Sequence, residues 1–150
     1  MLQLLPMAAS SLFALAVGFI LARQQNSKIT RYGIDAGLPF AHGVAYGHQV
    51  FLSGVTAQAD GAPISERDSV EEQTRRVLAV IDKRLALAGT DKTKVLQAQV
   101  WLKDIQGGFA AMNSEWNKWV DAQAKPARAT VEAQLAKPSM LVEIQVLAAL

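Results

Sequence analysis

The most constraining feature of this sequence is a hydrophobic pattern that switches repeatedly between helical and strand spacing. Ser69 and Glu72 form an S-x-x-E capping box, which is typical of a helix start. After it, apolar residues recur at helical spacing up to Gly89, a residue that commonly ends helices; they are Val70, Val77, Leu78, Ile81, Leu85 and Ala88. This stretch predicts an amphipathic helix between two regions of a different period.

Residues 95–102 alternate in the manner of a β-strand. The alternation predicts one face formed by Leu96, Ala98, Val100 and Leu102. The opposite face is expected to carry Val95, Gln97, Gln99 and Trp101. Before the first helix, "GVAYGHQVFLSGV" predicts two short strands joined at residues 46–49, because Gly47 lies between two apolar runs.

Helical spacing returns in residues 109–120, where Phe109, Met112, Trp116, Trp119 and Val120 are expected on one stripe. "QGGF" at 106–109 lacks the lysine and spacing of a phosphate loop and fits a helix entry. Pro126 then ends any helix before the last segment. The spacing of the three tryptophans favours core or interface positions over base stacking.

The segment "PARATVEAQLAKPSMLVEIQVLAAL", residues 126–150, predicts two further strands with a turn at "AKPS". In the first, Arg128, Thr130, Glu132 and Gln134 share one face. In the second, Glu143 lies on the face opposite Val142, Ile144, Val146 and Ala148. A simple hairpin between these strands would pair Glu143 nearer Gln134 than Arg128, and spacing alone favours surface positions for both charges.

The order strand, strand, helix, strand, helix, strand, strand predicts an α+β fold. We expect a mixed sheet of five or six strands with both helices packed on one face. The length of 150 residues fits one domain with an ordinary core. The open sheet face mixes polar and apolar groups, and we hypothesise that it packs against another subunit.

Residues 1–22 carry no charge, and residues 4–22 are mostly apolar and long enough to span a bilayer. Three interpretations remain open: a signal-anchor helix, which we favour, a cleaved signal peptide, and a leader added by an upstream start codon. Arg23, Lys28 and Arg31 follow directly, so an anchor through residues 2–22 would place the next domain in the cytoplasm. Residues 23–37 are expected to form a linker and a first short strand near 29–32, and residues 38–150 the folded domain.

Composition excludes several kinds of chemistry. The chain has no cysteine, which excludes disulfides, thiolate nucleophiles and cysteine zinc sites. The two histidines, His42 and His48, are too few for a typical metal site. Basic and acidic residues number 15 and 13 and are scattered, so no nucleic-acid-binding face is predicted.

Four blocks resemble, in order, the Rid family, also called the YjgF family, of imine and enamine deaminases. They are "VFLSG", "SVEEQTRRVLAVIDKRLALAG", "WLKDIQGGFAAMNSEW" and "PARATVEAQLAKPSMLVEIQVLAA". Any one block is a weak signal, whereas four in family order with matching spacing are specific. The resemblance covers residues from about 38 to the last block and excludes residues 1–22.

The resemblance implies a chorismate-mutase-like fold, a homotrimer with sites between subunits, and hydrolysis of 2-imino acids to 2-oxo acids and ammonia. It implies that Arg128 binds the substrate carboxylate, which a planar guanidinium can grip with two hydrogen bonds. It also implies that Glu143 handles the attacking water and its proton. Phe40, Ser53 and Asn113 match positions that line the family's cleft. The family implies no metal and no cofactor.

Two departures from the family pattern bear on activity. Phe40 in "LPFAHGV" stands where the family commonly has tyrosine, and Ser53-Gly54-Val55 stands where it has S-G-Q. An alternative is therefore a non-catalytic homotrimer that binds a small carboxylate, and Phe40 favours it. RNA binding or cleavage ranks third, because the net charge is only +2.

Overall fold

Helix α2 (Val70–Leu87) begins where the capping box predicts, because the Ser69 hydroxyl accepts a hydrogen bond from the backbone N–H of Glu72 at 3.2 Å. Glu72 does not return the bond; its carboxylate pairs with Arg75 at 2.8 Å and Arg76 at 3.3 Å. The helix ends before Gly89, which adopts φ 81°. These contacts come from a computed structural model that describes residues 28–34, 37–65 and 67–150.

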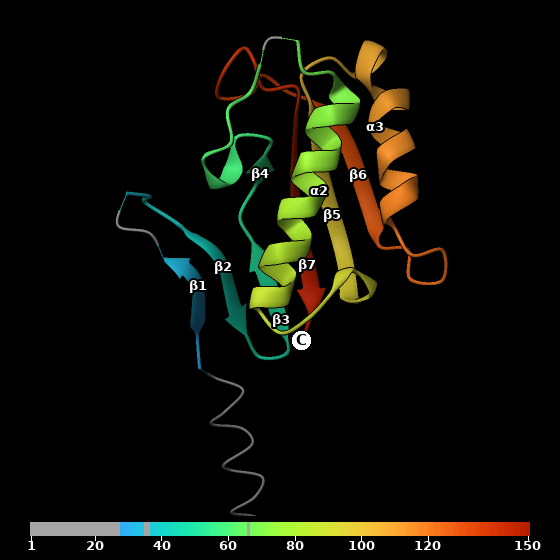
Figure 1. Ribbon diagram of the computed structural model, residues 1–150. Helices are drawn as coiled ribbons and strands as arrows, with labels where there is room; N and C mark the ends of the chain where they lie inside the picture. The colour runs from blue at the N-terminus through green and yellow to red at the C-terminus, as the bar shows by residue number, and fades with distance from the viewer. Residues whose placement is uncertain (1–27, 35–36, 66) are drawn as a thin grey trace, which may run out of the picture.

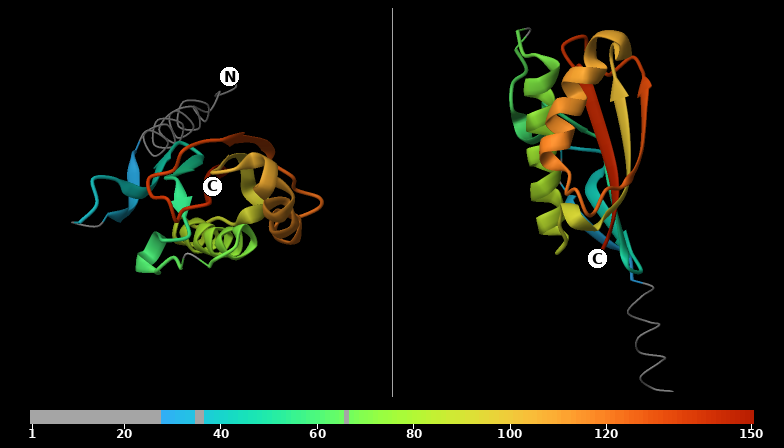
Figure 2. Two further views of the ribbon diagram at one scale, coloured as in Figure 1. Left: turned by 90° about the horizontal axis from the view of Figure 1, so that it is seen from above. Right: turned by 90° about the vertical axis from the view of Figure 1, so that its right-hand side faces the viewer.

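The described residues form one mixed sheet with α2 and α3 (Ile105–Trp119) on the same face (Figures 1 and 2). The strands are β1 (Thr30–Ile34), β2 (Ala41–Tyr46), β3 (Gln49–Leu52), β4 (Val55–Thr56), β5 (Val95–Leu102), β6 (Ala127–Glu132) and β7 (Val142–Ala149). Two short 3₁₀ helices, η1 (Ala59–Gly61) and η2 (Lys92–Lys94), lie in connections. The predicted α+β class, with both helices on one face, is confirmed.

The spatial order of the strands is β1-β2-β3-β7-β5-β6, and β4 pairs with β7. β5 and β6 are parallel, with α3 in the crossover between them, and the other pairs are antiparallel. The predicted hairpin forms between β2 and β3, where Gly47 at φ 63° makes the tight turn. β6 and β7 do not form a hairpin, because β5 lies between them and pairs with both.

The hydrophobic core lies between the helices and the sheet. Fully buried residues come from the predicted stripe of α2 and the inward faces of the central strands; they include Val77, Ile81, Leu85, Val50, Leu52, Val100, Leu102, Met112, Val142 and Ile144. Each such side chain stabilises the fold by about 1.5–3 kcal/mol through removal from water. This packing fixes the direction in which every second residue of β5 and β7 points.

Three sequence predictions are corrected by the packing. A bulge between Val95 and Gln97 resets the alternation of β5, so Val95 is in the core and Leu96 is 46% exposed. Phe109 is 40% exposed, whereas the helical stripe placed it with Met112 in the core. The sequence also did not predict strand β4, whose two residues, Val55 and Thr56, pair with Ile144 and Glu143 of β7.

The prediction of a transmembrane helix is also corrected. In the part of the chain that the structure describes, no helix is both long and apolar enough to cross a bilayer. Residues 1–22, on which the prediction rested, lie outside the described residues.

Candidate functional site

Arg128 on β6 points to the helical side of the sheet and rests on α3. Its Nη2 donates a hydrogen bond to Oδ1 of Asn113 at 2.7 Å, and its Nη1 lies 3.9 Å from the sulfur of Met112. The guanidinium carbon is 4.9 Å from the ring centroid of Trp116, which is a cation–π distance. We call Arg128, Asn113, Trp116 and Thr130 the arginine half-site.

Partial burial lowers the pKa of Arg128 through desolvation, yet a guanidinium stays charged in proteins. The guanidinium has five N–H donors, and Asn113 and Met112 engage only part of them. Thr130 lies two residues further along the same face. Its hydroxyl is buried and has no hydrogen-bond partner among the described residues. The arginine half-site can therefore offer several donors to a carboxylate.

Glu143 on β7 points to the opposite face of the sheet, because it alternates with the buried residues Val142 and Ile144. Its Oε1 lies directly against Gly54, so close that a Cβ at position 54 would collide with it. Burial raises the pKa of Glu143 by desolvation. We call Glu143, Gly54, Ser53 and Phe40 the glutamate half-site.

Ser53 and Phe40 complete the glutamate half-site. The Ser53 hydroxyl donates a hydrogen bond to the carbonyl of Ala41 at 2.5 Å, and its backbone N–H donates to the carbonyl of His42 at 3.0 Å. Its hydroxyl proton is therefore committed, while its lone pairs remain able to accept. Phe40 is 49% exposed and lines a cavity together with Gly54.

The single chain does not bring the two half-sites together. Ala98 of β5 pairs with Arg128, whereas Trp101 of β5 pairs with Glu143. The two charges are thus separated by a whole strand and lie on opposite faces of the sheet. Among the described residues, no group of three or more His, Asp or Glu side chains is arranged to hold a metal ion.

Comparison with known proteins places this arrangement in a family. The family model described as Endoribonuclease L-PSP matches residues 30–150. The chain belongs to the Rid (YjgF) family. A solved member of the YjgF protein family from Neisseria meningitidis is 39% identical, with a TM-score of 0.73 over 83% of this chain and 96% of that one.

Two curated relatives agree. The RutC family protein YoaB of Escherichia coli is 36% identical over 77% of this chain and 95% of its own length. A RutC family protein of Haemophilus influenzae is 48% identical over 51% of this chain and 66% of its own length. The family description names an endoribonuclease and the relatives carry family names, so the reaction of this Rid domain must be argued from its site.

The predicted site residues divide between the two half-sites of the Rid domain. The structure places Arg128 with Asn113, and Glu143 against Gly54, the residue that follows Ser53. Phe40 lines the same cavity as Gly54. Sequence reasoning did not nominate Thr130 or Trp116 for the site. Thr130 had a signal, because it shares the face of Arg128 at strand spacing; Trp116 had none, because helical spacing favoured a core role.

Proposed function

We propose that this chain is an imine deaminase that hydrolyses 2-imino acids to 2-oxo acids and ammonia. The observation that carries the proposal is the guanidinium of Arg128, half-buried on Trp116 and oriented by Asn113 with donors to spare. A planar cation held in this way suits a carboxylate, which accepts two parallel charge-assisted hydrogen bonds.

The second group that the reaction needs is a proton acceptor near neutrality. Glu143 suits this role because burial raises the pKa of its carboxyl and so strengthens it as a base. The carboxylate takes a proton from water as the oxygen attacks the C=N carbon. It returns that proton to the nitrogen, which gives a 2-amino-2-hydroxy acid. The carboxylate then takes the hydroxyl proton and passes it to the amine, so that the C–N bond breaks, the carbonyl of the 2-oxo acid forms and ammonia leaves.

We further propose that the chain acts as a homotrimer in which Arg128 of one subunit faces Glu143 of a neighbour. The separation of the two groups within one chain supports this assembly, because no motion of a side chain can cross the sheet. Exposed apolar residues on the open face, including Phe51 and Val131, also fit a surface that is covered by another subunit.

A deaminase assay tests the proposal. An imine generated by an amino-acid oxidase is allowed to hydrolyse with and without the full chain, and oxo-acid release is followed. Arg128→Ala should lower kcat/KM by at least about tenfold, because a charged hydrogen bond contributes about 1.5–3 kcal/mol. Arg67→Ala, at an exposed arginine outside the site, is the matched control. No acceleration over the uncatalysed rate by the unaltered chain contradicts the proposal.

A second function, binding of a small carboxylate without turnover, is favoured by the glutamate half-site. Phe40 has no hydroxyl, and the Ser53 hydroxyl proton is already bound to Ala41. This function predicts that a 2-oxo acid raises the Tm of the chain in an Arg128-dependent manner while imine hydrolysis stays at background. Turnover above background rejects it.

A further inference from the structure

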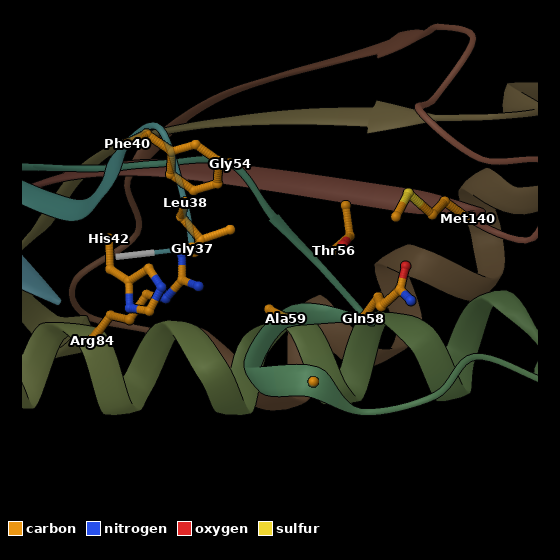
Figure 3. A pocket seen from close by; sticks show the side chains of 11 residues that line it. Gly37, Leu38, Phe40, His42, Gly54, Thr56, Gln58, Ala59, Arg84 and Met140 are labelled. Atoms are coloured by element: carbon orange, nitrogen blue, oxygen red, sulfur yellow. The ribbon is translucent and has the colours of Figure 1, made fainter. Parts of the chain in front are cut away.

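A cavity of about 640 Å³ lies beside the glutamate half-site (Figure 3). It is closed on one side by α2 and η1 and on the other by residues 37–42. The space exists because β4, among the described strands, pairs only with β7, so the sheet leaves a gap between β4 and the start of β2. This volume falls within the range of small-molecule pockets.

Two independent contacts connect the cavity to Glu143. Thr56 lines the cavity and pairs directly with Glu143 across β4 and β7, which puts both side chains on the same face. Gly54 also lines the cavity and touches the carboxylate of Glu143. Glu143 does not itself line the cavity; Gly54 and Thr56 are the lining residues that connect it to the cavity.

The lining beside Gly54 is mainly apolar. Leu38 and Phe40 lie close to Gly54, and Ala59 lies on the side of η1 (Figure 3). Met140 lies at one end, near Gln58. His42 and Arg84 lie together toward the other end, away from Met140. A substrate atom held near Glu143 would thus have an apolar space next to it that is far larger than a methyl group.

We propose that this cavity receives the side chain of the substrate and that the chain prefers 2-imino acids with long apolar side chains. This inference rests on the proposed deaminase function and names its substrate class. A 2-imino acid derived from methionine, leucine or phenylalanine fills the space that 2-iminopropanoate leaves empty. One methylene in an apolar pocket changes kcat/KM by about tenfold or more, so the preference is measurable.

The test compares imines of two sizes on the full chain. D-amino acid oxidase converts D-alanine, D-methionine and D-phenylalanine to imines, and the stereochemistry at the α-carbon is lost in that step. We expect kcat/KM for the methionine and phenylalanine imines to exceed that for 2-iminopropanoate by at least about tenfold. Equal values, or a preference for 2-iminopropanoate, overturn the inference while the deaminase function stands.

In the second part of the test, larger side chains are introduced to fill the cavity. Ala59→Leu adds bulk inside it and should lower kcat/KM for the two large imines by about tenfold, with little change for 2-iminopropanoate. Ala62→Leu makes the same change three residues along, outside the lining, and should change neither. Met140→Phe repeats the filling from the other end if Ala59→Leu lowers the yield of folded protein. A uniform loss on all imines overturns the inference.

The two proposals fail in distinguishable ways. Absence of turnover on every imine overturns the deaminase function and this substrate class with it. If turnover depends on Arg128 but depends neither on the size of the substrate side chain nor on the volume at Ala59, only the substrate class is overturned.

Discussion

The arginine half-site and the glutamate half-site differ in how each holds its charged group. Arg128 is surrounded by side chains that contact it: the amide of Asn113, the ring of Trp116 and the sulfur of Met112. The carboxylate of Glu143 instead occupies the space that a side chain at position 54 would fill, because residue 54 is glycine. The first arrangement suits a rigid clamp for a fixed anion, and the second suits a carboxylate that must gain and lose a proton.

The largest expected effect comes from removing the charge of Glu143. Glu143→Gln keeps the shape but cannot accept a proton, so kcat should fall by about 10²-fold or more while KM changes little. Steady-state kinetics on a preferred imine would show it. Adding Gln145→Glu to this variant places a charge two residues along the same face and should not restore kcat. Recovery of kcat would mean that position 143 acts only through its local charge.

Gly54→Ala tests whether the glutamate half-site requires a residue without a Cβ at position 54. A Cβ at position 54 would also lie 3.0 Å from the carboxyl carbon of Glu143, so the side chain must move. We expect kcat/KM to fall by about tenfold, since misplacing a catalytic group by a fraction of its length is costly.

Gly89→Ala is the matched control for that variant. Its Cβ would meet no atom within 4 Å, and the cost arises only from φ 81°. It should lose about 1 kcal/mol of stability and no activity. Equal activity losses in the two glycine variants, measured with denaturant unfolding alongside, would show that Gly54 acts through stability.

Substitutions in the arginine half-site should change KM rather than kcat. Removing the ring with Trp116→Leu takes away a cation–π contact of about 0.5–2 kcal/mol, which corresponds to a rise in KM of roughly two- to thirtyfold with kcat retained. Trp116→Phe should recover part of it. Trp119→Phe, at the buried neighbouring ring that bonds Asp82, should change Tm and leave KM unaltered. A fall in kcat without a change in KM contradicts the clamp.

The smallest expected effect is on stability as a function of pH. The pKa of Glu143 is raised by burial in the folded chain, so the folded state holds this proton more tightly than the unfolded chain. Stability contributed by this position is therefore highest below its ordinary pKa and falls as pH rises through the raised value. Glu143→Gln should gain stability relative to the unaltered chain between pH 4 and pH 7, as measured by urea unfolding. No relative gain would indicate that the carboxylate is not desolvated.

Local signals in the sequence were sufficient for the helices and the first hairpin. Ser69, Glu72 and Gly89 mark the bounds of α2 by groups that bond within one turn. The same reasoning failed at Leu96, because a bulge depends on pairing with β7 and leaves no trace in the alternation of β5. Alternating hydrophobicity in a sequence predicts where a strand forms, but it does not predict which strand pairs with it.

The candidate site likewise combines features that the sequence could predict with features that it could not. Spacing placed Arg128 on a strand, but only the parallel pairing of β5 and β6 and the crossover of α3 bring Asn113 and Trp116 to it. Family resemblance nominated Glu143, yet the reason for Gly54 beside it became visible only in three dimensions. Contacts between residues far apart in sequence assemble the candidate site, and periodicity does not encode them.

The position of β7 has a consequence for synthesis of the chain. β7 lies between β3 and β5, so the sheet formed by β1, β2 and β3 has no strand pairing with β5 and β6 until residues 142–149 are present. A nascent chain stopped before Val142 would expose two half-sheets with unpaired edges to the ribosome and to chaperones. Folding of this domain is thus expected to wait for β7, which also carries Glu143 of the glutamate half-site.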